Sequence, residues 1–141
     1  MKEKHQKSIL LVEFFFLLFL DLLAKYIIRQ NGGFYVCNYG ISWGIKISNL
    51  LFILIWLILN LSLVYFFKKA LNKENFFQKQ FIILIFAGSI GNLIGRIYDG
   101  CVIDFIKIPF FNFPFFNFAD TFIFTGCIFL IIHIVLPKDC E

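Results

Sequence analysis

Two aspartates, Asp104 and Asp120, are the residues of this sequence whose type and placement could carry out a reaction. Asp104 follows one long apolar segment by a few residues and Asp120 begins the next, so neighbouring helices would bring both to the same depth. Two carboxylates held close cannot both ionise easily, so one keeps a proton and the other can act as a base. Such a pair can deprotonate a water, direct it at a carbonyl and protonate the leaving amine. The spacing leaves a second interpretation open, in which Asp120 caps its helix and Asp104 is a solvated strand residue.

Further polar residues are placed to converge on the same boundary, namely Asn38, Asn92, Arg96 and Asn117. An asparagine offers both a donor and an acceptor, so it can orient a carboxylate or hold a peptide carbonyl. Arginine adds a fixed fork of donors. For Arg96 the alternative is a side chain that simply extends to the membrane interface.

Asp21 and Lys25 are two more charged residues within an apolar segment. Their spacing of four places them on one helix face within pairing distance. Charges in lipid cost roughly 2.5–3.5 kcal/mol each at a helix centre, so each needs an explanation. A structural ion pair and a polar site near the outer face are two compatible interpretations.

The elements that must position these residues are set by an apolar composition. The 141 residues are 60% hydrophobic and 16% charged, and the mean hydropathy is +0.85. A soluble domain would be about half apolar and a quarter charged, and one small core could not bury this much apolar surface. We therefore expect a single membrane domain over residues 1–141. The net charge of +4 comes from residues spread between apolar runs, which argues against a nucleic-acid partner.

Four windows are long and apolar enough to span a bilayer: 8–28, 50–67, 81–97 and 119–136. The first is preceded by lysines, as in a signal peptide, but it contains charged residues and no small-x-small cleavage site follows it. We expect it to be an uncleaved helix. Glycines at 88, 91 and 95 have the small-residue spacing of close helix packing.

Lysine and arginine counts predict the orientation of these helices. Eight lie in the terminal segments and the connection between the second and third windows, against four in the other connections. Both termini should then face the cytoplasm, and segments 30–49 and 98–118 should face outward. Their β-type and aromatic composition favours short strands and a half-buried segment on the membrane surface.

The chain has four cysteines, without the CxxC or histidine-rich spacing of a metal site. Cys37 and Cys101 would both face the outer side and could pair there, although we favour the interpretation that they fill apolar space.

Five motifs in order resemble the lipoprotein signal peptidases, the bacterial signal peptidase II family. They are DLLAK at 21–25, NYGISWG at 38–44, GSIGNLIGR at 88–96, VIDF at 102–105 and FNFAD at 116–120. Each motif is weak alone, but together they cover nearly the whole chain. The sequence departs from the family pattern at Leu22, Ala24, Ser89 and Gly95, which affects none of the matched catalytic positions.

This resemblance implies a specific fold and activity. The fold would be an all-α membrane protein with four transmembrane helices, a small β cradle and a surface half-helix on the outer, periplasmic side of the inner membrane. The activity would be that of an aspartic endopeptidase, which cuts prolipoproteins before a cysteine bearing a diacylglyceryl group and needs no metal or organic cofactor. Asp104 and Asp120 match the catalytic pair. The residues that match supporting or substrate-contacting positions are Asp21, Lys25, Asn38, Asn92, Arg96 and Asn117. A single chain supplies all of them, so a monomer should suffice, with membrane lipid and the lipidated signal peptide as partners.

Two other classes of function stay open. In a proton-coupled transporter or channel the aspartates would form a relay, but carboxylates on one side only and the lack of an inverted repeat argue against it. A non-catalytic scaffold that binds signal peptides would need the same fold but would tolerate loss of either aspartate.

Overall fold

The computed structural model describes residues 2–40, 49–71, 76–110 and 113–135 of the chain. In this part it contains the helices α1 (Lys2–Gln30), α2 (Asn49–Leu71), α3 (Phe76–Asp99) and α4 (Phe118–Val135), and the strands β1 (Val36–Asn38) and β2 (Val102–Asp104). The prediction of four helices is confirmed, although residue 136 lies outside the described part. The helix α1 begins at residue 2 rather than 8, because hydropathy detects only its apolar part while lysine, glutamate and glutamine continue the helix readily.

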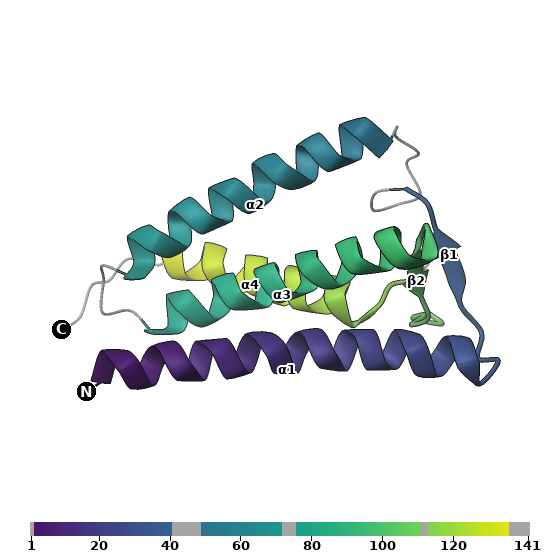
Figure 1. Ribbon diagram of the computed structural model, residues 1–141, viewed down its shortest axis with the longest axis horizontal. Helices are drawn as coiled ribbons and strands as arrows, with labels where there is room; N and C mark the ends of the chain where they lie inside the picture. The colour runs from purple at the N-terminus through teal and green to yellow at the C-terminus, as the bar shows by residue number, and fades with distance from the viewer. Residues whose placement is uncertain (1, 41–48, 72–75, 111–112, 136–141) are drawn as a thin grey trace.

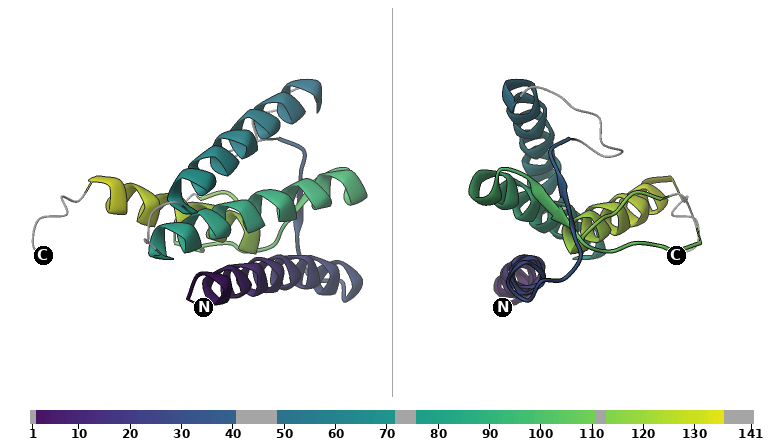
Figure 2. Two further views of the ribbon diagram at one scale, coloured as in Figure 1. Left: turned by 60° about the vertical axis from the view of Figure 1, so that its left-hand side comes forward. Right: turned by 90° about the vertical axis from the view of Figure 1, so that its right-hand side faces the viewer.

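Helix α3 lies at the centre and contacts α1, α2 and α4 (Figure 1). Helix α2 diverges from α1 toward the end of the molecule that carries the sheet, and the end-on view separates the four helices clearly (Figure 2). The ends of α1 and α3 lie at this same end beside the strands, whereas α4 begins short of it and is reached by the chain that follows β2 (Figure 1). Segments that are far apart in sequence are thereby brought together there.

Small residues allow α3 and α4 to pack closely. A Cβ atom on Gly88 would collide with the carbonyl oxygen of Ala119, and one on Gly126 would lie 2.7 Å from the carbonyl oxygen of Phe81. A Cβ on Gly91 would lie 2.5 Å from Asp21 Oδ2 on α1. The prediction of close packing is confirmed at Gly88 and Gly91. At Gly95 it is wrong, because the nearest atom to a Cβ there would be at an ordinary distance of 3.5 Å.

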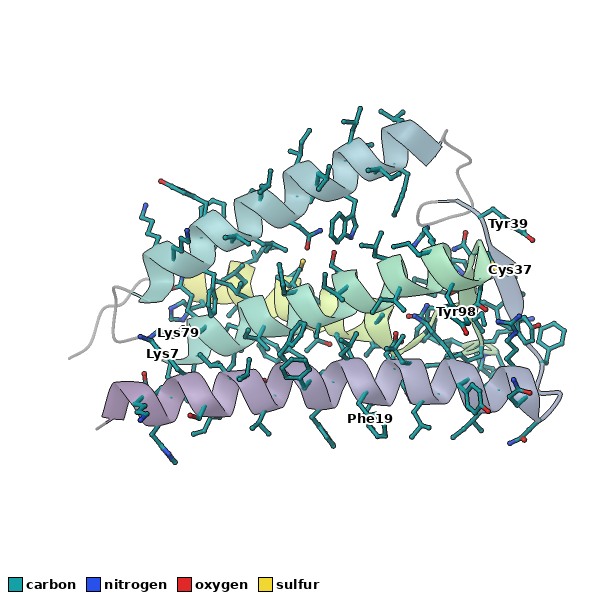
Figure 3. All side chains as sticks on the ribbon, viewed as in Figure 1. Lys7, Phe19, Cys37, Tyr39, Lys79 and Tyr98 are labelled. Carbon is teal, nitrogen blue, oxygen red and sulfur yellow. A yellow bond between two sulfur atoms is a disulfide. The ribbon has the colours of Figure 1, made fainter. Side chains whose placement is uncertain are left out.

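Two of the helices meet the length and hydropathy expected of membrane spans. They are Leu51–Lys69 within α2 and Phe76–Asp99, which is α3, with mean hydropathies of 2.1 and 1.7. Helix α4 is shorter, with an apolar stretch over Phe118–His133. Helix α1 directs large apolar side chains such as Phe19 away from the other helices, and Phe19 is 59% exposed (Figure 3). This exposed apolar surface fits a lipid environment. That α1 and α4 also cross the membrane stays a prediction.

The two strands form an antiparallel sheet in which Val36 pairs with Asp104, Cys37 with Ile103 and Asn38 with Val102. The predicted short strands are therefore confirmed. Beyond β2, Ile106 and Phe116 form an isolated antiparallel bridge that leads the chain back to α4. The surface half-helix has no counterpart among the described residues of segments 30–49 and 98–118, and residues 41–48 and 111–112 lie outside them.

Cys37 and Cys101 form a disulfide, with their Cα atoms 5.6 Å apart. Our favoured interpretation, in which both cysteines only fill apolar space, is wrong. The sheet explains the pairing. Cys37 is opposite Ile103, so Cys101, two residues before Ile103, lies diagonally across the ladder from it.

Candidate active site

Asp104 ends β2 and is buried, with only 2% of its surface exposed. Side chains two apart on a strand share a face, so the pairing of Asn38 with Val102 makes Asn38 a diagonal neighbour of Asp104. Nδ2 of Asn38 donates to Oδ2 of Asp104 at 3.0 Å, and Nδ2 of Asn117 donates to Oδ1 at 2.7 Å. The interpretation of Asp104 as a solvated strand residue is therefore wrong.

Burial is the main reason that the pKa of Asp104 rises from an ordinary 3.8 to about 6. The charge of Asp120 acts in the same direction, because a second negative charge disfavours ionisation. Hydrogen bonds from Asn38 and Asn117 and the positive charge of Lys25 act in the opposite direction but do not outweigh the loss of water. Asp104 is thus a carboxyl group that keeps its proton to a higher pH than an ordinary aspartate, with a pKa of about 6.

Asp120 occupies the third position of α4 and forms a capping box with Asn117, the residue before the helix. Asn117 Oδ1 accepts from the backbone N–H of Asp120 at 2.9 Å, and Asp120 Oδ2 accepts from the backbone N–H of Asn117 at 3.2 Å. The interpretation of Asp120 as part of a helix cap is therefore correct. The cap is not the only contact of the Asp120 side chain, because Asn92 Nδ2 donates to the other carboxylate oxygen, Oδ1, at 2.7 Å.

Asn117 joins the two aspartates into one network. It is fully buried, and its Nδ2 donates to Asp104 Oδ1 and also to Asn92 Oδ1, the latter at 3.2 Å. Its backbone N–H and Oδ1 hold Asp120 at the same time. Elements that are separate in sequence, β2 and the start of α4, therefore deliver two carboxylates to one place. The predicted convergence of Asn38, Asn92 and Asn117 on this pair is confirmed.

Asp21 and Lys25 form a buried ion pair with 2.7 Å between Lys25 Nζ and Asp21 Oδ2. Lys25 Nζ also donates to Asn92 Oδ1 at 3.0 Å, and Asp21 Oδ1 accepts from the backbone N–H of Ala119 at 2.9 Å. Ala119 lies in the first turn of α4, where backbone N–H groups have no partner within the helix. Asp21 is therefore a cap for α4 supplied by α1. The interpretation as a structural ion pair is confirmed, and placement of the pair near the outer face stays a prediction.

Arg96 anchors the chain after β1 rather than contacting an aspartate. Its Nη2 donates to the carbonyl oxygen of Gly40 at 2.6 Å, and its guanidinium lies 4.3 Å from the ring centroid of Phe52. Gly40 in turn donates its backbone N–H to Asn38 Oδ1 at 2.9 Å. Arg96 is thus connected to Asp104 through Gly40 and Asn38. It is half-buried, so the interpretation of a side chain that only extends to the interface is wrong.

Two parts of the site were missed from the sequence. The backbone N–H of Ala119 has no side-chain signature, and Gly91 leaves the space that Asp21 occupies although its spacing indicated only helix packing. Among the described residues, no three His, Cys, Asp or Glu side chains are placed to hold one metal ion. The arrangement itself offers two carboxylates and the amide groups that donate to them.

Comparison with known proteins gives a consistent result. A family model described as signal peptidase (SPase) II matches residues 13–136. Proteins named lipoprotein signal peptidase from Staphylococcus aureus strains JH9 and Newman are 38% identical over 105 residues, which is 72% of this chain and 63% of each relative. The chain thus spans less than two thirds of the length of these relatives. Two solved structures of a bacterial membrane enzyme, obtained by the in meso method at 2.3 and 1.9 Å, are 31% identical with a TM-score of 0.78. The first match covers 95% of this chain and 94% of the solved one, and the second 94% and 95%.

Proposed function

The chain belongs to the signal peptidase II family, and we propose on this premise that it is a membrane aspartic endopeptidase whose catalytic residues are Asp104 and Asp120. One observation carries the proposal. Asn117 donates to Asp104 with its side chain while exchanging hydrogen bonds with Asp120, which holds two carboxylates in one buried network. A carboxylate pair shielded from water is the arrangement that shares a proton and activates water without a metal.

The division of labour follows from the surroundings of each carboxylate. Asp104 holds the proton, because it is the more deeply buried and has a raised pKa. Asp120 carries the negative charge, because it lies in the first turn of α4, where the helix dipole favours an anion. Asn92 and Asn117 fix its two oxygens, so a lone pair stays aimed at a water molecule.

In the first step Asp120 takes a proton from water, and the hydroxyl oxygen bonds to the carbonyl carbon of the scissile peptide. The proton of Asp104 moves to the carbonyl oxygen, which gives a neutral tetrahedral diol. In the second step the proton now on Asp120 moves to the amide nitrogen as the C–N bond breaks. Asp104 recovers a proton from the diol, and a carboxylic acid is left. The pair returns to its starting state.

The substrate is a prolipoprotein, cut before a cysteine that carries a diacylglyceryl group. Its signal peptide is an apolar helix, so it reaches the site by lateral movement in the bilayer. The apolar surfaces of α1 and α2 and the apolar stretch of α4 support placement of all four helices in the membrane. The excess of lysine at the opposite end from the aspartates supports an active site at the outer face of the inner membrane, with cytoplasmic termini.

Signal-peptide removal from a lipid-modified prolipoprotein tests this proposal. We expect Asp104→Asn and Asp120→Asn each to lower the cleavage rate by about a thousandfold, since general acid–base groups contribute roughly 10²–10⁴. Both variants should insert and fold, because asparagine retains the shape of each side chain. Asp99→Asn is the matched control, since Asp99 ends α3 but pairs with Arg29 and not with the network around Asp104 and Asp120. Near wild-type cleavage by either catalytic variant would favour a non-catalytic scaffold.

A further inference from the structure

Apart from the ladder to β2 and the hydrogen bond from Arg96 to Gly40, the strand that carries Asn38 has few contacts that hold it in place. β1 has only three residues, and its one neighbour in the described structure is β2. Two-stranded sheets of this kind are marginally stable in isolation. Large side chains on and beside β1 are turned outward, with Phe34 73% and Tyr39 68% exposed (Tyr39 is labelled in Figure 3). Little apolar burial therefore keeps Asn38 in place.

A covalent link lies next to this residue. Cys37 directly precedes Asn38, and its partner Cys101 lies three residues before Asp104. Alternation along the strands directs Asn38 and Asp104 to one face of the sheet and Cys37 to the other. The disulfide thus fixes the register of the two strands from the back without touching the carboxylates.

We propose that the Cys37–Cys101 disulfide is a positioning element of the active site, which holds the Asn38 amide against Asp104 and makes turnover dependent on the oxidised state. This inference rests on the proposed function, because it assigns a role within that same dyad. The hydrogen bond that it protects is the 3.0 Å contact from Asn38 Nδ2 to Asp104 Oδ2.

Loss of this hydrogen bond should change the pKa of Asp104 in a predictable direction. The Asn38 hydrogen bond favours the ionised form and lowers the pKa of Asp104, so its removal raises that pKa. The other charges that face Asp104 are Asp120 on α4, Lys25 on α1 and Arg96 on α3. None of these is carried by β1, so opening the disulfide leaves them in place. The alkaline limb of kcat/KM should therefore move to higher pH while the plateau falls, since Asp104 is no longer oriented.

The test compares the protein in lipid nanodiscs before and after treatment with dithiothreitol. Dithiothreitol is oxidised to its cyclic disulfide as Cys37 and Cys101 each gain a hydrogen. We expect the plateau of kcat/KM to fall about tenfold, as for a modest misplacement of a catalytic group. The alkaline limb of the pH profile should move to higher pH. The double variant Cys37→Ala/Cys101→Ala should reproduce both changes without reductant. Asn38→Ala should reproduce them too and should show no further response to reductant. Cys127→Ala, which alters a free cysteine, is the matched control and should respond like wild type.

An unchanged pH profile and plateau in the reduced protein and in the double variant would overturn the proposal. A lower plateau with an unmoved limb would also overturn it, because this is what loss of stability alone produces. If the variant does not fold, reduction of folded wild type gives the same comparison. If wild type cleaves nothing, the proposed function fails, and the disulfide is then tested by infrared titration of the Asp104 carboxyl, with Asp104→Asn as the reference. A titration midpoint that does not rise on reduction would reject the role independently of activity.

Discussion

The side-chain amide nitrogen of Asn117 lies 2.7 Å from Oδ1 of Asp104, so the residue that caps the start of α4 also holds the carboxylate that ends β2. The same side chain caps the helix through its oxygen, by accepting from the backbone N–H of Asp120. The geometry of the aspartate pair and the start of α4 are therefore determined by one buried residue. Helix packing and the geometry of the carboxylate pair are coupled through it.

Substitution of Asn117 can separate these two roles. Serine caps helices about as well as asparagine but has no amide to donate to Asp104, whereas alanine does neither. We expect Asn117→Ser and Asn117→Ala to lower cleavage to the same extent, by roughly 10²-fold as expected for a misplaced catalytic group. Asn117→Ala should be less stable than Asn117→Ser by about 1 kcal/mol, the usual value of an N-cap. Cleavage rates and melting temperatures of both variants check this. Equal stability of the two variants would mean that the helix cap is not needed. Full activity of Asn117→Ser would mean that the amide is not needed.

A pair of glycines on α3 gives a sharp test of the buried carboxylate on α1. A Cβ on Gly91 would lie 2.5 Å from Asp21 Oδ2, but one on Gly95 would meet nothing closer than 3.5 Å. Gly91→Ala must displace Asp21, which disturbs its bonds to Lys25 and to the Ala119 amide. We expect a loss of stability of about 2–3 kcal/mol, as for overpacking of a core, and lower activity. Gly95→Ala should be neutral or slightly stabilising, because alanine favours helix. The melting temperatures decide the matter, and equal values for the two variants would contradict the structure.

The sequence was sufficient to predict the parts of this site that follow from regular periodicities. Long apolar windows predicted the helices, and polar residues within or beside them, such as Asn92 and Asn117, could be placed near one boundary of the membrane. The spacing of Asp21 and Lys25 predicted an ion pair, since residues four apart share a helix face.

Contacts that depend on three-dimensional register could not be predicted in this way. The disulfide requires the alignment of β1 with β2, and nothing in the spacing of Cys37 and Cys101 specifies it. The cap that Asp21 provides to Ala119 joins residues 98 apart and involves a backbone group, which has no sequence signal. Arg96 faces both aspartates as expected, but its hydrogen-bond acceptor is the carbonyl oxygen of Gly40, which is equally invisible in the sequence.

Asp21 should prove more important for stability than for chemistry. Asp21→Ala removes the partner of the buried Lys25 and the acceptor for Ala119, and breaking a buried pair costs about 3–5 kcal/mol. Asp21→Asn keeps an acceptor oxygen and should lose less stability and retain measurable cleavage. Melting temperatures together with cleavage per folded molecule distinguish the two effects. A well-folded Asp21→Asn variant with no cleavage at all would show a direct part in the reaction.

The raised pKa of Asp104 has a consequence for stability that can be measured without substrate. Its pKa is about 6 in the folded protein against 3.8 ordinarily, so between these values the folded state binds more protons than the unfolded state. The free energy of unfolding contributed by this group is therefore highest at low pH and falls as pH rises from about 4 to about 6. The full change is at most about 3 kcal/mol for a difference of this size.

We expect the melting temperature of wild type to fall across this range, and that of Asp104→Asn, which has no proton to lose there, to fall much less. Asp99→Asn should follow the wild-type curve, because Asp99 pairs with Arg29 and is not part of the network around Asp104. Parallel curves for wild type and Asp104→Asn would mean that Asp104 does not hold its proton in the folded protein, and the assignment of the proton to this residue would be wrong.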